Sequence, residues 1–105
     1  MNNGEKGLFF EGKARIFLES KGFKILVSNA RWRKTEVDII CEKYNNGMNE
    51  IYAVEVKFRS NPVFFSISNA QLTRIDLYMS MNFPGVFFKT LIILCSNTQI
   101  ELIEL

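Results

Sequence analysis

The chain has 105 residues, of which 48% are hydrophobic and 23% are charged, and its formal net charge is +2. These proportions exclude a disordered chain, and the length favours a single domain over residues 1–105. The sequence contains no histidine, which excludes Ser-His-Asp and Cys-His catalysis and histidine-ligated metal centres. Any catalysis would therefore use carboxylates, lysine, tyrosine, cysteine or a hard metal ion.

The apolar runs and the cysteines favour a cytoplasmic protein that does not contact a membrane. The longest apolar run, Leu91–Cys95, is far shorter than the ~20 residues that span a bilayer. The first residues, MNNGEK, lack the charged-then-apolar pattern of a signal peptide. Cys41 and Cys95 lie in apolar runs without a second cysteine or a histidine at ligand spacing, so we expect buried free thiols rather than a zinc site.

The first third of the chain predicts a helix followed by a strand. Apolar residues at helical spacing, ended by Gly22, predict a helix over Gly7–Lys21. A strand is expected at Phe23–Ser28. The residues after it, 29–34, carry three basic side chains and are expected to form a connection.

The centre of the chain predicts a β-hairpin, and the remainder predicts a second helix and two more strands. Thr35–Glu42 and Ile51–Phe58 are both rich in β-branched residues, and the Asn46-Gly47 step between them is a strong hairpin signal. The elements expected after the hairpin are a helix at Ile67–Met81 and strands at Lys89–Cys95 and Gln99–Leu105.

The expected order of elements, αβββαββ, predicts an α/β fold with a mixed central sheet. Two arrangements of the helices fit this order. Either one helix packs on each face of the sheet, or both helices lie near one end.

Charged residues within the two hairpin strands are the strongest functional signal. Because side chains alternate between the two faces of a strand, Glu36 and Asp38 are expected on one face of the first hairpin strand, and Val37 and Ile39 on the other. Glu55 and Lys57 are likewise expected on one face of the second strand. A fold carries charges in apolar strands when they are paired, hydrated in a cleft or bound to a metal.

This arrangement of Asp38, Glu55 and Lys57 suits a hard cation. Two carboxylates and a main-chain carbonyl can offer Mg²⁺ three oxygens and leave room for water and phosphate. Lys57, about 7 Å along the strand from Glu55, could orient an attacking water or neutralise charge on the phosphate. The alternative is a cross-strand ion pair on a solvated sheet face.

Two segments carry a resemblance to a known family. Residues 35–40, TEVDII, and residues 53–59, AVEVKFR, resemble the two signature segments of the YraN-like predicted endonucleases. The sequence is also similar to Holliday-junction resolvases and to the wider PD-(D/E)xK nuclease superfamily. The spacing of Gly7, Glu11 and Gly22 resembles that of the family's first helix. One departure is Thr35, which stands where the family has glycine.

The resemblance implies a restriction-endonuclease-like core and a role for each motif residue. Asp38 and Glu55 would bind the metal, Lys57 would be the catalytic lysine, and Glu11 would approach the site from the first helix as a further catalytic residue. The alternative for Glu11 is an exposed helix charge. Gln71, on the second helix, would contact the site or the DNA backbone, and its alternative is a solvated side chain.

A basic cluster before the first motif strand is a candidate nucleic-acid contact. Its members are Arg31, Trp32, Arg33 and Lys34. The cations would hold phosphates and the indole would stack on an unpaired base. The alternative is a solvated loop whose Trp32 packs against the core. Arg59 could extend the positive surface, together with Lys89.

Five phenylalanines favour either additional core or a subunit interface. They are Phe64, Phe65, Phe83, Phe87 and Phe88. A small domain that exposes aromatic side chains often dimerises. A homodimer would present two sites to a symmetric branched DNA.

The sequence therefore predicts a Mg²⁺-dependent endodeoxyribonuclease, with Mn²⁺ as a substitute cation. We expect DNA as its partner, in branched or single-stranded form, and a role in DNA repair or recombination. The alternative is a non-catalytic nucleic-acid-binding module that retains the nuclease fold. A third interpretation, a structural or subunit-interaction domain, predicts no metal affinity and no salt-dependent DNA binding.

Overall fold

The computed structural model describes residues 3–32, 35–59 and 67–105. Two helices and five strands follow one another in the predicted order αβββαββ. Their bounds are α1 Asn3–Ser20, β1 Lys24–Trp32, β2 Thr35–Asn45, β3 Met48–Phe58, α2 Asn69–Asn82, β4 Phe88–Cys95 and β5 Ile100–Glu104.

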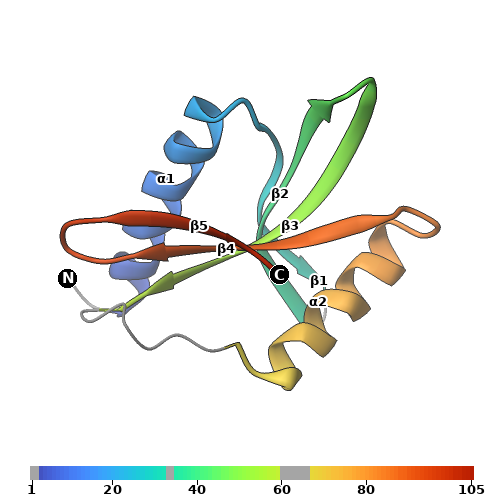
Figure 1. Ribbon diagram of the computed structural model, residues 1–105. Coiled ribbons are helices and arrows are strands. Elements are labelled where there is room, and N and C mark those ends of the chain that lie inside the picture. The colour runs from blue at the N-terminus through green and yellow to red at the C-terminus, as the bar shows by residue number, and fades with distance from the viewer. Residues whose placement is uncertain (1–2, 33–34, 60–66) are drawn as a thin grey trace.

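The five strands form one mixed sheet in sequential order, β1-β2-β3-β4-β5. The pairs β1–β2, β2–β3 and β4–β5 are antiparallel. The pair β3–β4 is parallel, which requires a crossover connection, and α2 lies in that crossover. Figure 1 shows the two helices on opposite sides of the sheet. The predicted α/β class and mixed sheet are confirmed, and they are compatible with a restriction-endonuclease-like core.

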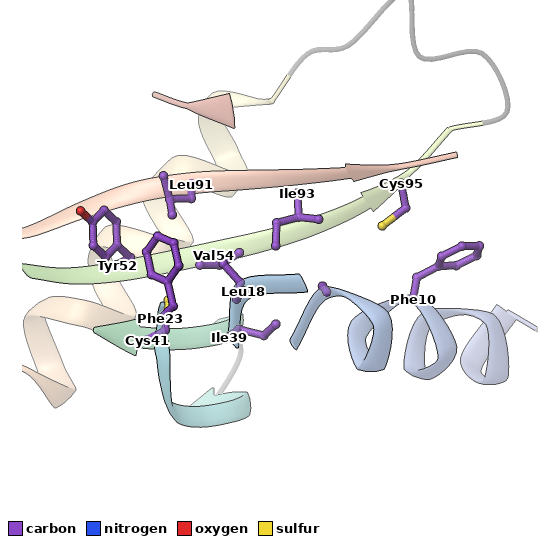
Figure 2. Packing of buried hydrophobic residues seen from close by; sticks show 11 residues of the cluster. Phe10, Leu18, Phe23, Ile39, Cys41, Tyr52, Val54, Leu91, Ile93 and Cys95 are labelled. Carbon is purple, nitrogen blue, oxygen red and sulfur yellow. The ribbon is translucent and has the colours of Figure 1, made fainter. Parts of the chain in front are cut away.

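The two helices cover different faces of the sheet. Phe10, Ala14 and Leu18 of α1 pack against strand residues such as Ile39 and Val54, as Figure 2 shows for the labelled members of this cluster. On the other face, α2 packs its buried side chains against β1, β2 and β3; the fully or nearly buried members of that cluster are Ala30, Val37, Ile40, Ala53, Ile75, Tyr78 and Met79. Of the two arrangements compatible with the element order, the structure has one helix on each face.

The predicted hairpin is confirmed down to its turn. Asn45 pairs with Met48, so the loop consists of Asn46 and Gly47 alone. Both have positive φ angles, 50° and 82°. This left-handed pair is the turn whose twist matches that of antiparallel strands, and asparagine and glycine are the residues that adopt it at the lowest cost.

The first strand is longer than the sequence predicts. It was expected to end at Ser28, but β1 continues to Trp32 and stays paired with β2. Two irregularities account for the difference. The register shifts between Ile25 and Val27, and Asn29 has a left-handed φ of 55°. Such residues normally indicate a turn, but here they only distort a continuous strand.

The cysteine prediction is also confirmed, since Cys41 and Cys95 are free and buried. Burial raises the pKa of the Cys41 thiol to about 12, which keeps it protonated at neutral pH. Of the five phenylalanines considered above, Phe83 and Phe88 pack against the α2 cluster, while Phe87 is 83% exposed. Phe64 and Phe65 lie outside the described residues. Neither described helix is long and apolar enough to cross a membrane.

Candidate functional site

The sheet forks at the two motif carboxylates. Among the described residues, the β2–β3 ladder runs from the hairpin turn to the pair Ile39↔Val54 and ends there. Beyond that pair, β2 stays with β1 as far as Trp32↔Thr35. In the same stretch, β3 stays with β4 as far as Phe58↔Cys95. Asp38 is the first residue of β2 beyond the last pair, and Glu55 is the first residue of β3 beyond it.

The carboxylate of Asp38 bridges the fork. Its Oδ2 accepts a hydrogen bond from the backbone N–H of Val56, at 2.8 Å. In a continuous antiparallel ladder a backbone carbonyl of the partner strand would take this N–H. The hydrogen bond holds Asp38 against β3 and satisfies a donor that the end of the ladder would leave open.

Asp38 and Glu55 form a carboxyl pair in which Glu55 is buried and Asp38 is half-buried. Glu55 is only 8% exposed. Burial and the neighbouring negative charge of Asp38 raise the pKa of Glu55 to about 8, against the opposing charge of Lys57. Burial also raises the pKa of Asp38, while the Val56 N–H and the charge of Lys57 act to lower it. Two carboxylates held this close favour sharing a proton or taking up a cation.

Alternation of side chains places Lys57 beside Glu55, as predicted. Val54 belongs to the α1 cluster with Val56 and Phe58 packed against it, and Ala53 belongs to the α2 cluster. Glu55 and Lys57 follow Ala53 at two-residue steps on the same face of β3. The charge of Lys57 lowers the pKa of both Asp38 and Glu55, so all three groups interact.

Strict alternation was wrong for β2. Val37 and Ile39 were expected on one face, but Val37 packs in the α2 cluster and Ile39 packs in the α1 cluster. The change falls at Asp38, where β2 leaves β3. A strand that turns away from its neighbour also rotates its side chains, so the two-residue period is lost across the fork.

A hollow of about 250 Å³ opens in front of Asp38. Its lining comes from α1, β1, β2 and β3: Gly7, Leu8, Glu11, Asn29, Arg31, Glu36, Asp38 and Val56. Glu11 is half-buried in this lining, and its pKa is raised by burial and by the charge of Asp38. The structure therefore brings Glu11 of the first helix to the same hollow as Asp38.

The acidic residues near the hollow do not form a three-carboxylate cage. Among the residues that the structure describes, no group of three or more Asp, Glu or Cys side chains is placed to hold a metal ion. Asp38 and Glu55 are a pair rather than part of such a group. Mg²⁺ in proteins is often held by one or two carboxylates, with water and substrate phosphate as its other ligands.

Arg31 and Glu36 lie on the rim of the hollow and face each other across β1 and β2. They are register partners, and Arg31 Nε lies 3.6 Å from Glu36 Oε2. Arg31 Nε also donates a hydrogen bond to Asn29 Oδ1, at 3.1 Å. Arg31 was expected in a loop, but it lies in a strand beside the carboxylates.

Asn29 was missed at the sequence level. An asparagine inside an otherwise strand-like segment is a signal that could have found it, because asparagine tolerates the left-handed conformation. The structure places it in the lining of the hollow and on the Arg31 guanidinium.

Of the other predicted nucleic-acid contacts, those that the structure describes do not line the hollow. Trp32 packs partly against the α2 cluster. Arg33 and Lys34 lie outside the described residues. Arg59 is exposed at the end of β3 and its Nη1 donates to the Phe58 carbonyl, at 2.7 Å. Gln71 is half-buried on the first turn of α2 and is not part of the lining of the hollow.

Lys89 does not extend a positive surface. Its Nζ lies 3.1 Å from Glu50 Oε2 and 3.7 Å from Glu104 Oε1. Glu50 Oε2 also accepts a hydrogen bond from the Tyr52 hydroxyl, at 2.6 Å. These contacts neutralise Lys89 and tie β3 to β4 and β5.

The fold and the site define a mixed α/β protein with a carboxyl pair and a lysine at a fork of its central sheet. A family model described as "Uncharacterised protein family UPF0102" matches residues 10–88. The chain belongs to this family, which is the YraN-like group. The resemblance predicted from the two strand segments is therefore confirmed.

Relatives in several bacteria share this family. A UPF0102 protein of Sulfurihydrogenibium sp. (strain YO3AOP1) is 34% identical over 113 residues, which cover 99% of this chain and 95% of the relative. A UPF0102 protein of Clostridioides difficile (strain 630) is 50% identical over 64 residues, which cover 61% of this chain and 53% of the relative. A UPF0102 protein of Syntrophomonas wolfei is 42% identical over 72 residues, 69% of this chain and 59% of the relative. The second and third alignments thus span little more than half of the relatives' length.

Proposed function

We propose that this protein is a metal-dependent endonuclease that hydrolyses DNA phosphodiester bonds. Its expected substrates are branched or single-stranded DNA in repair or recombination in the cytoplasm. One observation carries the proposal: the sheet forks so that Asp38 and Glu55 form a carboxyl pair, with Lys57 next to them on β3. A fold that only needed stability would be served better by apolar residues at these buried positions.

The carboxyl pair fits a hard divalent cation. Asp38 is held against β3 by the Val56 N–H, which fixes its orientation before any ligand arrives. The raised pKa of Glu55 records the cost of burying its charge and of placing that charge beside Asp38, and a divalent cation would offset both. Mg²⁺, with Mn²⁺ as a substitute, is the expected cofactor because both prefer oxygen ligands.

The residues around the pair suit phosphodiester hydrolysis. A cation bound by Asp38 and Glu55 would supply Lewis-acid polarisation of the phosphate. Lys57 carries a positive charge that acts on both carboxylates, and the same charge would stabilise the negative charge that develops on the phosphate. Glu11 reaches the same hollow from α1 and would help to hold water there by hydrogen bonding.

DNA contacts beyond the site would come from cations near the two arms of the fork. Arg31 on the rim is the best placed, and the exposed Arg59 follows Lys57 by two residues. We retain Gln71, Trp32, Arg33 and Lys34 as further proposed contacts. A homodimer is also proposed, on the basis of exposed apolar side chains such as Phe87 and Ile16. Light scattering of the purified protein measures its molar mass and so tests for the homodimer directly.

The experiment that tests the function is cleavage of labelled single-stranded, duplex, flap and four-way-junction DNA. Each substrate is incubated with Mg²⁺, with Mn²⁺ and with chelator. The variants Asp38→Asn and Lys57→Ala are compared with the wild type, and Lys24→Ala, an exposed lysine of β1 outside the hollow, is the matched control. Metal-dependent cleavage is expected in the wild type and the control, and a loss of about 100-fold or more in the two site variants.

Two results would overturn the proposal. Cleavage that persists in folded Asp38→Asn would assign the activity to another site or to a contaminant. Absence of cleavage on every substrate, with DNA binding retained, would favour the non-catalytic nucleic-acid-binding module instead. Circular dichroism of each variant verifies that a lost activity is not a lost fold.

A further inference from the structure

Strand β1 is distorted at two points, and the second of them, Asn29, lines the hollow. Its register shifts between Ile25 and Val27, and Asn29 adopts a left-handed φ of 55°. Asn29 is one of two described non-glycine residues with positive φ, and the other lies in the hairpin turn, where that geometry is required. A turn does not explain Asn29, because β1 continues through it to Trp32. Backbone strain of this kind often accompanies functional geometry.

The distorted residue holds an arginine. Asn29 Oδ1 accepts a hydrogen bond from Arg31 Nε, at 3.1 Å. The shortest contact of Arg31 with Glu36 is also at Nε, at 3.6 Å. Both contacts therefore use the inner edge of the guanidinium group. Among the described residues, neither of its two terminal amino groups, which form the fork that matches a phosphate, donates a hydrogen bond.

The held arginine lines the hollow in front of Asp38. Asn29 and Arg31 belong to the same lining as Glu11, Glu36 and Asp38, and the charge of Arg31 acts on Glu11. Three of these five side chains are acidic, so an anionic ligand entering the hollow needs a cation beside it. Arg31 is the cationic residue in that lining.

We infer that Asn29 is a positioning residue that orients Arg31 to bind a phosphate group in the hollow. The inference deepens the proposed function and rests on it for the identity of the ligand, a nucleic-acid phosphate next to the carboxyl pair. In the absence of that phosphate, Glu36 lies beside the guanidinium, with its Oε2 3.6 Å from Arg31 Nε. Arg31 is thus a phosphate-binding residue of the site itself rather than a member of a surrounding basic loop.

The test measures DNA binding, so that it does not depend on cleavage. A fluorescein-labelled single strand and a labelled four-way junction are titrated with protein, in chelator and in Ca²⁺, over a range of salt concentrations. The variants are Asn29→Gly, which keeps the left-handed backbone and removes the acceptor, Arg31→Gln, and the double variant. Lys24→Gln, which removes a cation from the same strand outside the hollow, is the control.

The expected results form a double-mutant cycle. Arg31→Gln weakens binding about ten-fold and lowers the slope of log affinity against log salt by about 1. Asn29→Gly weakens binding about three-fold or more and also lowers the slope, although it removes no charge. The double variant binds no more weakly than Arg31→Gln alone, because Asn29 acts through Arg31.

Several outcomes would overturn the inference. They are wild-type affinity and slope in Asn29→Gly, losses that multiply in the double variant, or a wild type that binds no DNA. Thermal melts separate these outcomes from a loss of fold. Failure of this inference can be distinguished from failure of the endonuclease proposal. Binding that depends on Asn29 and Arg31 without any cleavage supports the inference alone, and cleavage that is indifferent to both residues supports the endonuclease alone.

Discussion

The two halves of the β2–β3 hairpin are held together in different ways. In the half nearer the turn, the strands pair continuously from Asn45↔Met48 to Ile39↔Val54. In the other half they separate, and a hydrogen bond from the Val56 N–H to the Asp38 carboxylate crosses the gap. One pair of strands therefore contains a regular ladder and an opening that a side chain bridges.

The side chains of the two halves differ in the same way. The paired half buries apolar groups, including Ile39, Ile40 and Val54, whose burial stabilises the fold. The forked half buries Glu55, whose pKa is raised to about 8 by burial and by Asp38. The apolar burial in the paired half offsets the cost of burying Glu55, which is unfavourable when charged, in the forked half. This division is what a binding or catalytic site on a small fold requires.

The largest expected effect comes from weakening the paired half. Ile39→Ala removes a fully buried side chain of the α1 cluster and is expected to lower the free energy of unfolding by about 2–5 kcal/mol. Urea denaturation of the wild type and of Ile39→Ala measures this loss of free energy. The cation dependence of any activity that remains should be unchanged, because Asp38 and Glu55 are untouched. A loss of cation dependence in folded Ile39→Ala would show that the halves are not independent.

The next effect concerns the pH dependence of stability. Glu55 has a pKa of about 8 in the folded protein and 4.5 as its ordinary value. Between these values the folded state holds a proton that the unfolded state releases, so the contribution of Glu55 to stability is greatest below pH 4.5 and is lost as the pH rises through 8. In chelator, the loss of stability with rising pH should be smaller in Glu55→Gln than in the wild type, by about 2 kcal/mol.

The measurement is urea denaturation of wild type and Glu55→Gln at pH 5 and at pH 8. Glu19→Gln, which removes an exposed carboxylate of α1 outside the hollow, is the matched control. If wild type and Glu55→Gln lose the same stability between the two pH values, Glu55 is not the group that makes the forked half unfavourable.

A smaller effect is expected when a cation is added. Mg²⁺ or Mn²⁺ at ten times its dissociation constant should stabilise the folded protein by about 1.4 kcal/mol, which raises the melting temperature by roughly 5–10 °C. Asp38→Asn and Glu55→Gln should abolish the rise, while Glu19→Gln retains it. Scanning calorimetry at pH 7 measures the effect. An equal rise in all four proteins would place cation binding outside the carboxyl pair.

The same division separates what the sequence predicts from what it misses. The paired half follows local rules: Asn46-Gly47 predicts the turn, and two-residue alternation predicts the faces of β3. Asp38, Glu55 and Lys57 stand out as charges in apolar strands, which is also a local signal. The fork depends on how β1–β2 twists away from β3–β4, and no local pattern records that. Alternation therefore failed at Val37, and β1 was ended too early at the left-handed Asn29.

Glu36 offers the smallest and most specific change in the forked half. It lies exposed on the rim, 3.6 Å from Arg31, and an exposed ion pair of this kind contributes little to stability, so Glu36→Gln should leave unfolding within about 0.5 kcal/mol of wild type. DNA binding in chelator should become about two- to three-fold tighter, because the variant removes a negative charge from the hollow and frees the guanidinium for phosphate. Fluorescence anisotropy measures this change, with Glu101→Gln on β5 as the control. Weaker binding in Glu36→Gln would mean that Glu36 helps Asn29 to orient Arg31 rather than competing with the phosphate.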